Sequence, residues 1–540
     1  MKYCEQRTVM EWQFASEHKR DDPWRDVRFH AIVTDPDGKE MQIPGFWKGG
    51  DTWAFRYASA TVGEHRYRTV CSDKADASLH GREGKFAITP YEGDNPLYRH
   101  GAARAASNRR HLEHEDGTPF FWLGDTWWMS LTDRLTWPDD FQWLIRDRRE
   151  KGFSVIQVVA GLYPDMAPFD SRGANEGGIA WEAGFSRLNP AFFDAADRKI
   201  AAMADAGLMP CLVGCWGYYL AFAGAEVIRR HWEYLIARYG AYPVAWCVAG
   251  EALMPYYLTE TFGDRTKWKA YEDEMRPVWS SIAAYVKERD PFGRLVTIHP
   301  VEYGRHCVED ASMLDLEMLQ TGHGGFLSLE RSVRMVAESC AKEPRLPVIN
   351  SEVNYEGIGA SSQADVQRYT AWSCVLNGAC GHTYGANGLW QVNPEDRPYG
   401  ASPTGIAWGH TTWREAAELP GSAQVGRIRR ILSELEWWDM EPHPEWLEPA
   451  AEQVDFLNKA YMAGVPGRFR LAFLPNGKAF SGVELRELER GTVYRATLID
   501  PVTGARTDWG QAEADENGNW STGRLPVFQD WVLLLRRIET

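Results

Sequence analysis

The chain has 540 residues, more than one hydrophobic core usually serves, so we expect two or three domains with one large central domain. Its residues are 44% hydrophobic and 25% charged, as in ordinary globular proteins, and its formal net charge is −16. This charge disfavours nucleic acid and anionic membranes as partners. It indicates a substrate that is neutral, or one that a local basic pocket binds.

The N-terminal residues, 1–14, lack the apolar segment and the small-residue cleavage pattern of a secretory signal. No apolar run approaches the roughly 18 residues that a membrane helix needs. Nine cysteines without regular spacing indicate free thiols in a reducing compartment. We therefore expect a cytoplasmic protein without membrane contact, or a periplasmic or secreted one if a signal has been removed. The oligomeric state is not indicated.

Aromatic residues are unusually abundant, with 25 Trp, 22 Tyr and 22 Phe. Several of them cluster near the ends of predicted segments, as in Trp127-Trp128, residues 216–219 and Trp437-Trp438. Sugars combine apolar C–H faces with polar rims, and aromatic rings near polar groups suit such ligands. The composition thus favours a carbohydrate as the substrate.

Residues 1–95 are expected to form a small β-sandwich. Short alternating or β-rich runs follow one another between residues 9 and 90, and turn signals such as Asp35-Pro36-Asp37-Gly38 separate them. This spacing, without any helical period, is typical of antiparallel sheets. A linker begins at Asn95-Pro96 and leads into the next domain.

Residues 96–447 are expected to form a (β/α)₈ barrel, also called a TIM barrel. Strand patterns alternate with helix patterns eight times over about 270 residues, which matches this fold in count and length. A doubly wound open sheet is the alternative, but the chain contains no GxGxxG turn. The predicted strands are residues 120–125, 154–160, 209–216, 244–250, 294–299, 313–319, 346–352 and 380–384. The predicted helices are residues 139–151, 191–206, 225–239, 267–289, 328–342, 364–377 and 422–437.

Residues 448–540 are expected to form a second β-sandwich. From about residue 455 the pattern is again one of short β-rich runs, at 469–474, 479–485, 494–499 and 531–535. The whole chain is therefore predicted to be a barrel with a small all-β domain on each side.

Two glutamates dominate the predicted barrel. Glu251 ends the apolar run 244–250, and Glu352 follows the run 346–350. In a barrel the carboxyl ends of the strands face one cleft, so these two side chains are expected to face each other. A single strand-end glutamate is more often part of a salt bridge, but two opposed carboxyls are what glycoside hydrolysis requires. Glu356 is the local alternative to Glu352.

Other strand ends carry polar and aromatic side chains that are expected to line a sugar pocket. No His-x-His ends the first strand, and neither His/Cys metal spacing nor a GxSxG motif occurs, so neither a metal nor an organic cofactor is expected. The predicted substrate-binding residues are Asp125, Trp127, Trp216, His299, Gln320, His323, Tyr384 and Trp390.

The run Pro119 to Trp128, PFFWLGDTWW, resembles the opening strand of the apiosidase-like glycoside hydrolases, family 140 and its relatives. The two glutamates are similar to the acid/base and the nucleophile of the wider retaining clan that includes family 5. The N-terminal sandwich resembles the module that precedes many such barrels. Residues 473–477 and 500–504 resemble a C-terminal sandwich module called collagen-binding-like.

The resemblance implies a retaining O-glycosyl hydrolase of oligo- or polysaccharides, with Glu251 as acid/base and Glu352 as nucleophile. Two departures bear on the sugar. The wider clan usually has Asn before the acid/base, where this chain has Gly250, and the apiosidase pattern has Asp at the position of Glu251. Apiose, another pentose, a hexose and a deoxysugar are all candidates. The alternatives in mechanism are an inverting glycosidase and a catalytically inactive carbohydrate-binding barrel.

Overall fold

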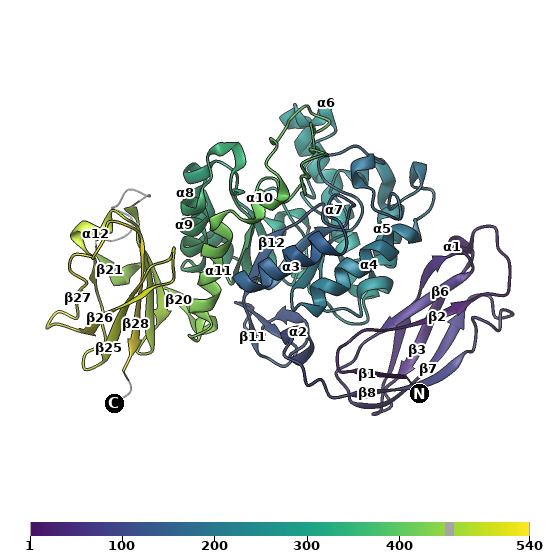
Figure 1. Ribbon diagram of the computed structural model, residues 1–540, viewed down its shortest axis with the longest axis horizontal. Coiled ribbons are helices and arrows are strands. Elements are labelled where there is room, and N and C mark those ends of the chain that lie inside the picture. Colours follow the sequence, from purple (N-terminus) through teal and green to yellow (C-terminus); the bar gives the residue numbers. More distant parts are fainter. Residues whose placement is uncertain (1, 449–457, 539–540) are drawn as a thin grey trace.

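The computed structural model describes residues 2–448 and 458–538. The chain forms three parts in a row: a β-sandwich near the N-terminus, a central barrel of strands and helices, and a second β-sandwich near the C-terminus (Figure 1). Since the barrel separates the two sandwiches, the N- and C-terminal parts lie at opposite ends of the molecule.

The N-terminal sandwich packs a five-stranded sheet, β1-β8-β7-β3-β4, against a three-stranded sheet, β2-β6-β5. All pairings are antiparallel except that of β1 with β8, which is parallel. Alternate residues of β3 are buried, as expected for a sheet with one face on the core. The strands are β1 Lys2–Glu5, β2 Met10–Ala15, β3 Phe29–Thr34, β4 Glu40–Pro44, β5 Phe46–Gly49, β6 Thr52–Tyr57, β7 Gly63–Cys71 and β8 Glu83–Thr89, with helix α1 at Pro23–Asp26.

The central part contains one eight-stranded parallel sheet in the order β16-β15-β14-β13-β12-β19-β18-β17. Every residue of these strands is buried, because helices cover the outside of the sheet and its own side chains fill the inside. The predicted (β/α)₈ barrel is confirmed. The strands are β12 Trp122–Thr126, β13 Val155–Val159, β14 Met209–Val213, β15 Ala245–Cys247, β16 Val296–Thr297, β17 Glu317–Gln320, β18 Val348–Glu352 and β19 Gly381–Tyr384.

The barrel closes between β16 and β17 without a regular ladder. The backbone N–H of Asp315 donates to the carbonyl of Val296 at 2.8 Å, and the Thr297 hydroxyl donates to the carbonyl of Leu316, also at 2.8 Å. These bonds bring β17 beside β16, so that the ends of all eight strands meet around one axis.

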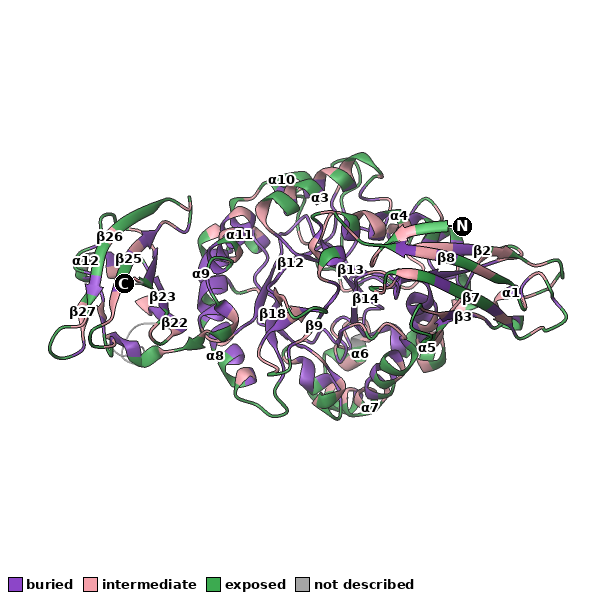
Figure 2. Ribbon diagram, turned by 90° about the horizontal axis from the view of Figure 1, so that it is seen from below, coloured by how far each residue is buried: buried purple, intermediate pink, exposed green. Residues whose placement is uncertain are grey.

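A ring of helices surrounds the strands, with buried faces turned toward the sheet and exposed faces toward solvent (Figure 2). Two of the predicted helices differ from the structure by more than two residues at one end. Helix α11 ends at Leu432 rather than at residue 437, and α5 begins at Tyr219, before an interruption at Gly224, whose φ is 79°. The helices are α3 Asp139–Lys151, α4 Pro190–Asp205, α5 Tyr219–Tyr239, α6 Thr259–Phe262, α7 Arg265–Arg289, α8 Leu329–Cys340, α9 Ala364–Val375, α10 Trp413–Ala417 and α11 Pro420–Leu432.

A short antiparallel sheet, β11-β10-β9, connects the first sandwich to the barrel. The start of the predicted strand 120–125 is divided between this sheet and the barrel, because β11 ends at Phe120 and β12 begins at Trp122. The elements of the connection are α2 Pro96–Arg99, β9 Ala103–Ala105, β10 Leu112–His114 and β11 Pro119–Phe120.

The C-terminal sandwich has a six-stranded sheet, β20-β22-β23-β28-β25-β26, and a three-stranded sheet, β21-β24-β27. The onset of β structure predicted near residue 455 falls in 449–457, outside the described residues. The elements are β20 Glu441–Pro442, β21 Leu447–Glu448, β22 Tyr461–Val465, β23 Phe469–Leu474, α12 Lys478–Ser481, β24 Glu484–Leu485, β25 Val493–Ile499, β26 Arg506–Glu513, β27 Trp520–Ser521 and β28 Trp531–Arg537. Among the helices of the described residues, none combines the length and the apolar character that crossing a membrane requires.

Candidate active site

Two glutamates meet at the carboxyl ends of the barrel strands. Glu352 is the last residue of β18, and Glu251 follows β15 after the short segment 248–250. Gln320, the last residue of β17, lies between them, with its Nε2 3.0 Å from Oε1 of each carboxyl. These two oxygens therefore cannot be further apart than twice that distance.

Two histidines hold Glu352. His299 Nε2 lies 3.0 Å from one carboxyl oxygen, and His323 Nε2 lies 3.0 Å from the other. Burial alone would raise the pKa of Glu352, but the hydrogen bonds from the two imidazoles outweigh it and lower the pKa to about 2. Glu352 is therefore an anion at neutral pH.

His299 is itself fixed from behind. It is fully buried, and its Nδ1 lies 3.2 Å from the hydroxyl oxygen of Ser351, which donates to the carbonyl of Leu319 at 2.9 Å. With both ring nitrogens in contact, the imidazole has one orientation. Its hydrogen bond in turn fixes the orientation of the Glu352 carboxylate.

Glu251 has a different environment. The indole Nε1 of Trp216 donates to its Oε2 at 3.0 Å, and Gln320 donates to its Oε1. Burial, and then the negative charge of Glu352, raise the pKa of Glu251 above its usual value. The backbone of Glu251 has a φ of 44°, in the left-handed region that a residue with a side chain seldom adopts. The surroundings thus favour the protonated form of Glu251 and the ionised form of Glu352.

Gly250 makes room for the indole that contacts Glu251. A Cβ at position 250 would lie 2.3 Å from the ring of Trp216, closer than any real contact. Since the indole fills the space in front of residue 250, no side chain fits there while Trp216 keeps its hydrogen bond to Glu251. The absence of Asn before Glu251 therefore follows from the position of Trp216.

A cavity of about 340 Å³ lies in front of the two carboxyls. Its wall is largely aromatic, and three buried polar atoms of its lining residues have no partner among the described residues: Gln320 Oε1, His323 Nδ1 and Trp390 Nε1. Such atoms in a cavity are available to a polar ligand. The aromatic residues of the wall are Trp128, Trp216, Tyr256, Tyr257, Tyr355, Trp390 and Trp408.

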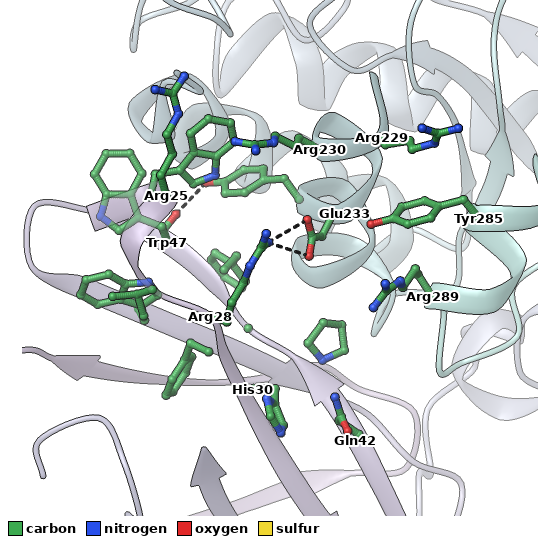
Figure 3. A pocket seen from close by; sticks show the side chains of 18 of the residues that line it. Arg25, Arg28, His30, Gln42, Trp47, Arg229, Arg230, Glu233, Tyr285 and Arg289 are labelled. Atoms are coloured by element: carbon green, nitrogen blue, oxygen red, sulfur yellow. Dashed lines mark hydrogen bonds and ion pairs between the residues drawn. The ribbon is translucent and has the colours of Figure 1, made fainter. Parts of the chain in front are cut away.

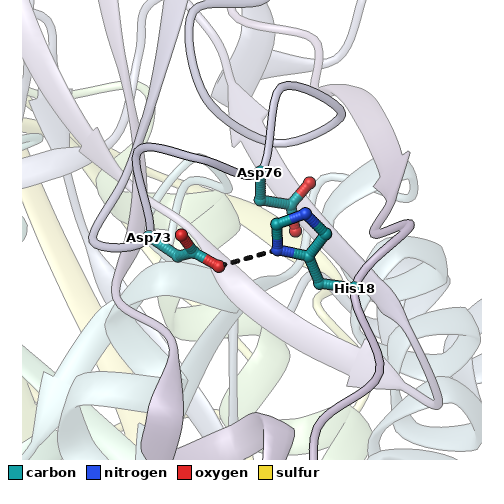
Figure 4. A group of neighbouring side chains, drawn as sticks. All are labelled: His18, Asp73 and Asp76. Atoms are coloured by element: carbon teal, nitrogen blue, oxygen red, sulfur yellow. Dashed lines mark hydrogen bonds and ion pairs between the residues drawn. The ribbon is translucent and has the colours of Figure 1, made fainter.

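By residue type, one cluster of the described residues could hold a metal ion. His18, Asp73 and Asp76 in the N-terminal sandwich place ligand atoms within 4.8 Å of one another (Figure 4). Arg20 Nη2, however, lies 2.8 Å from Asp73 and 2.9 Å from Asp76. The guanidinium already balances the two carboxylates, so we interpret the cluster as an ion-pair network that fixes a loop.

The model of the apiosidase-like catalytic domain matches residues 106–439, more than half of the chain. The chain belongs to the apiosidase-like family. It is accordingly a glycosidase. A domain of unknown function, DUF5060, matches residues 4–72 of this apiosidase-like protein.

Solved structures share the fold. A putative glycoside hydrolase from Bacteroides vulgatus is 20% identical, with 100% of each chain covered and a TM-score of 0.70. A family 5 glycoside hydrolase from Bacteroides vulgatus is 21% identical, with 83% of this chain and 95% of that chain covered and a TM-score of 0.67. A third glycoside hydrolase is 22% identical over 82% of this chain and 98% of its own, with a TM-score of 0.66. No curated protein sequence matches the apiosidase-like chain.

Six of the ten residues predicted to form the site line the cavity. A seventh, His299, contacts Glu352 from the barrel interior. The alternative carboxylate, Glu356, does not line the cavity. It instead accepts hydrogen bonds from the Tyr384 hydroxyl at 2.5 Å and the Gly421 N–H at 3.1 Å. The six lining residues are Trp216, Glu251, Gln320, His323, Glu352 and Trp390.

The structure corrects the expectation that Asp125, Trp127 and Tyr384 contact the substrate. Asp125 accepts hydrogen bonds from Arg148 Nε at 2.5 Å and Trp127 Nε1 at 2.7 Å, and all three side chains are fully buried. Tyr384 donates its hydroxyl to Glu356 instead. These polar strand-end groups bind one another inside the apiosidase-like barrel, because each has a buried partner of complementary charge or hydrogen-bonding capacity.

Much of the cavity wall was not predicted. Trp128 Nε1 donates to the Tyr355 hydroxyl at 3.1 Å, and the Asp165 carboxylate accepts from the Tyr257 hydroxyl at 2.7 Å and from Trp408 Nε1 at 3.2 Å. The sequence indicates the pair Trp127-Trp128, but Trp128 and not Trp127 lines the cavity. The other residues lie on loops, whose paths no short-range pattern indicates.

We expect Gly250→Ala to lower the melting temperature and the activity, because the new methyl group displaces the Trp216 ring from Glu251; overpacking of this kind costs about 1 to 3 kcal/mol. Thermal unfolding and turnover of an aryl glycoside measure the two effects. The same change in a Trp216→Ala background should cost much less stability, since the ring is gone. An equal cost in both backgrounds would contradict the steric explanation.

We expect Asp125→Asn to lower the free energy of unfolding by about 3 kcal/mol or more, because Arg148 then keeps a buried charge with a weakened set of partners. Urea denaturation measures the loss. The double variant Asp125→Leu/Arg148→Met, which removes both charges, should recover much of the stability. A single variant that stays fully stable but loses activity would show that Asp125 belongs to the reaction instead.

Proposed function

We propose that the chain hydrolyses glycosidic bonds of an oligo- or polysaccharide with retention of configuration at the anomeric carbon. Glu352 acts as the nucleophile and Glu251 as the acid/base. The observation that carries the proposal is that Gln320 joins the two carboxyls while their pKa values shift in opposite directions. Pairs of carboxyls with opposite shifts are the general pattern of acid/base assignments.

The separation of the carboxyls supports retention. Retaining glycosidases place their carboxyls about 5 to 5.5 Å apart, and inverting ones about 6.5 to 9.5 Å apart, because an inverting site needs room for a water molecule. Here one amide nitrogen lies 3.0 Å from an oxygen of each carboxyl, so these two oxygens are at most twice that distance apart, a close approach that favours the retaining arrangement. A carbohydrate-binding barrel without catalysis would not need this close approach.

The charges support the assignment of roles. A nucleophile must be ionised, and Glu352 is kept so by His299 and His323. An acid must keep its proton at the working pH, and the raised pKa of Glu251 favours that form. The reverse assignment would require each carboxyl to act against its surroundings.

The steps follow from these roles. A Glu352 oxygen attacks the anomeric carbon while the bond from that carbon to the leaving oxygen breaks, and the Glu251 proton moves to the leaving oxygen. The sugar is then an ester of Glu352. Glu251, now a carboxylate, takes a proton from water, whose oxygen attacks the same carbon and releases Glu352. Gln320 donates to both carboxyls, so its amide can stabilise negative charge on either of them.

The cavity supports a small sugar unit as the group that is bound. Its volume of about 340 Å³ lies at the lower end of the range for small-molecule pockets, about 300 to 1,000 Å³. Aromatic rings such as Trp390 offer faces for stacking, and the unpartnered atoms of Gln320 and His323 offer hydrogen bonds to hydroxyls. Because residue 250 has no side chain, the 2-hydroxyl contact of the wider clan must come from another group or be absent. Apiose, another pentose, a hexose and a deoxysugar remain the candidates.

We expect Glu352→Gln to abolish turnover of an aryl glycoside, because an amide cannot form the ester. Glu251→Gln should lower kcat by about 10² to 10⁴-fold, since it removes the acid/base. Glu356→Gln is the matched control: its carboxyl lies four residues from Glu352 but bonds to Tyr384 and Gly421, so folded enzyme should keep its kcat. NMR of the first-formed product should show retention. Near-normal activity of Glu352→Gln would refute the assignment, and an inverted product would favour the inverting mechanism.

We expect a bell-shaped dependence of kcat/KM on pH. Activity falls at low pH as Glu352 gains a proton near its pKa of about 2, and falls at high pH as Glu251 loses a proton above its raised pKa. His323→Ala removes one donor to Glu352, so the acid limb should move to higher pH. The exposed His306 gives a control, because His306→Ala should leave the profile unchanged. An acid limb that His323→Ala does not move would contradict the role of Glu352.

A further inference from the structure

A second cavity, of about 510 Å³, lies between the N-terminal sandwich and helices α5 and α7 of the barrel (Figure 3). We call it the arginine cleft. Among the described residues, none lines both this cleft and the cavity in front of the two glutamates. The two sites are therefore separate in space, and the catalytic proposal does not account for the arginine cleft.

The arginine cleft is basic, although the chain as a whole has a net charge of −16. Five arginines line it, against two glutamates, Glu226 and Glu233. In an acidic protein, arginines that gather around one hollow create a local field that attracts anions. The five are Arg25, Arg28, Arg229, Arg230 and Arg289.

The two glutamates are already paired within the cleft. Glu233 accepts from Arg28 Nη1 at 3.2 and 3.3 Å, and Glu226 accepts from Arg230 at 3.0 Å. They therefore balance only two of the five guanidinium groups. Arg25 forms an ion pair with Asp22 at 3.6 Å, and Asp22 does not line the cleft.

Two guanidinium groups make no ion pair with any described residue. Arg229 on α5 donates to the Ser281 hydroxyl at 2.9 Å, and Arg289 on α7 lies with its guanidinium 5.2 Å from the ring centre of Tyr285. In Figure 3, Tyr285 lies between Arg229 and Arg289 on the same side of the cleft. Two available positive charges thus flank one aromatic ring.

The walls of the cleft are held in place by a buried network beside it. Arg56 of the sandwich and Arg238 of α5 both form ion pairs with Asp197 of α4, and Arg56 also donates to the carbonyl of Arg238 at 2.7 Å. Arg56 is 4% exposed and Arg238 is fully buried. The sandwich and the barrel helices therefore present their two faces to a ligand at a fixed separation.

We propose that the arginine cleft binds a carboxylate-bearing oligosaccharide, that is, a chain that contains uronic acid residues. Arg229 and Arg289 would each bind a carboxylate, as the planar guanidinium does best, and Tyr285 between them would stack on a sugar ring. Gln42 and His30 on the sandwich side face the same cleft and suit hydroxyl groups.

The spacing of charge in the cleft favours this ligand over a densely charged anion. Glu226 and Glu233 lie among the arginines and would repel a heavily sulfated glycan, which carries several negative charges per disaccharide. A uronate chain carries one negative charge per sugar, so its carboxylates can meet the two unpaired guanidinium groups and avoid the glutamates.

Titration calorimetry of the full chain with a tetrasaccharide of galacturonic acid tests the proposal. The wild type should bind this probe, and its affinity should fall as the salt concentration rises. Arg229→Gln/Arg289→Gln should bind at least about tenfold more weakly, because each lost charged hydrogen bond is worth that much. A tetrasaccharide of galactose, which has no carboxylate, should bind more weakly to the wild type.

A matched control changes two arginines elsewhere on the barrel. Arg331→Gln/Arg334→Gln on α8 alters the net charge by the same amount, at positions exposed to solvent, and should bind the probe as the wild type does. The Arg229→Gln/Arg289→Gln variant should keep its melting temperature and its turnover of an aryl glycoside, since neither arginine lies at the active-site cavity. The proposal is overturned if the wild type does not bind the uronate, if both double variants bind equally well, or if the neutral tetrasaccharide binds as tightly. These outcomes do not depend on the roles of Glu251 and Glu352.

Discussion

One side-chain amide links the two halves of the candidate active site. Gln320 donates from a single nitrogen to Glu251 and to Glu352, so the two carboxyls are held close together. This contact requires a closed barrel. Its strand, β17, pairs with β18 on one side and meets β16 on the other, which is the neighbour of β15. In an open sheet, β15 and β18 would lie far apart, and no one residue could reach both glutamates.

Four carboxylates at or near the carboxyl ends of the barrel strands differ in their neighbours, and these neighbours set the charge that each one carries. Asp125 is neutralised by Arg148, and Glu356 is bonded to Tyr384 and to a backbone N–H; neither faces the cavity. Glu352 receives two imidazoles and stays charged, whereas Glu251 receives an indole and an amide beside that charge. Residue type alone does not separate these cases, because a carboxylic acid takes its role from burial, nearby charge and hydrogen bonds.

The N-terminal sandwich forms a charged interface with the barrel. Asp197 of the barrel pairs with Arg56 of the sandwich as well as with Arg238, so the interface between the two parts contains a buried charge network rather than only apolar contact. Such a network is costly to break, because each charge depends on the others. Its rigidity gives a fixed cleft next to the interface, in which the surface charge of this acidic protein is locally reversed.

The sequence by itself determined the type of fold and placed the two glutamates at the ends of barrel strands. Strand and helix periods are local, and a carboxylate directly after an apolar run can be recognised from a short stretch. It also identified Trp216, Gln320, His323 and Trp390 at strand ends that do reach the cavity. Only the tertiary structure decided which strand-end groups bind each other instead: Asp125 finds Arg148 on α3, and Tyr384 finds Glu356. The wall residues Tyr257 and Trp408 lie on loops far apart in the chain. Partners of this kind depend on how helices and loops return to the barrel, which no short stretch of sequence encodes.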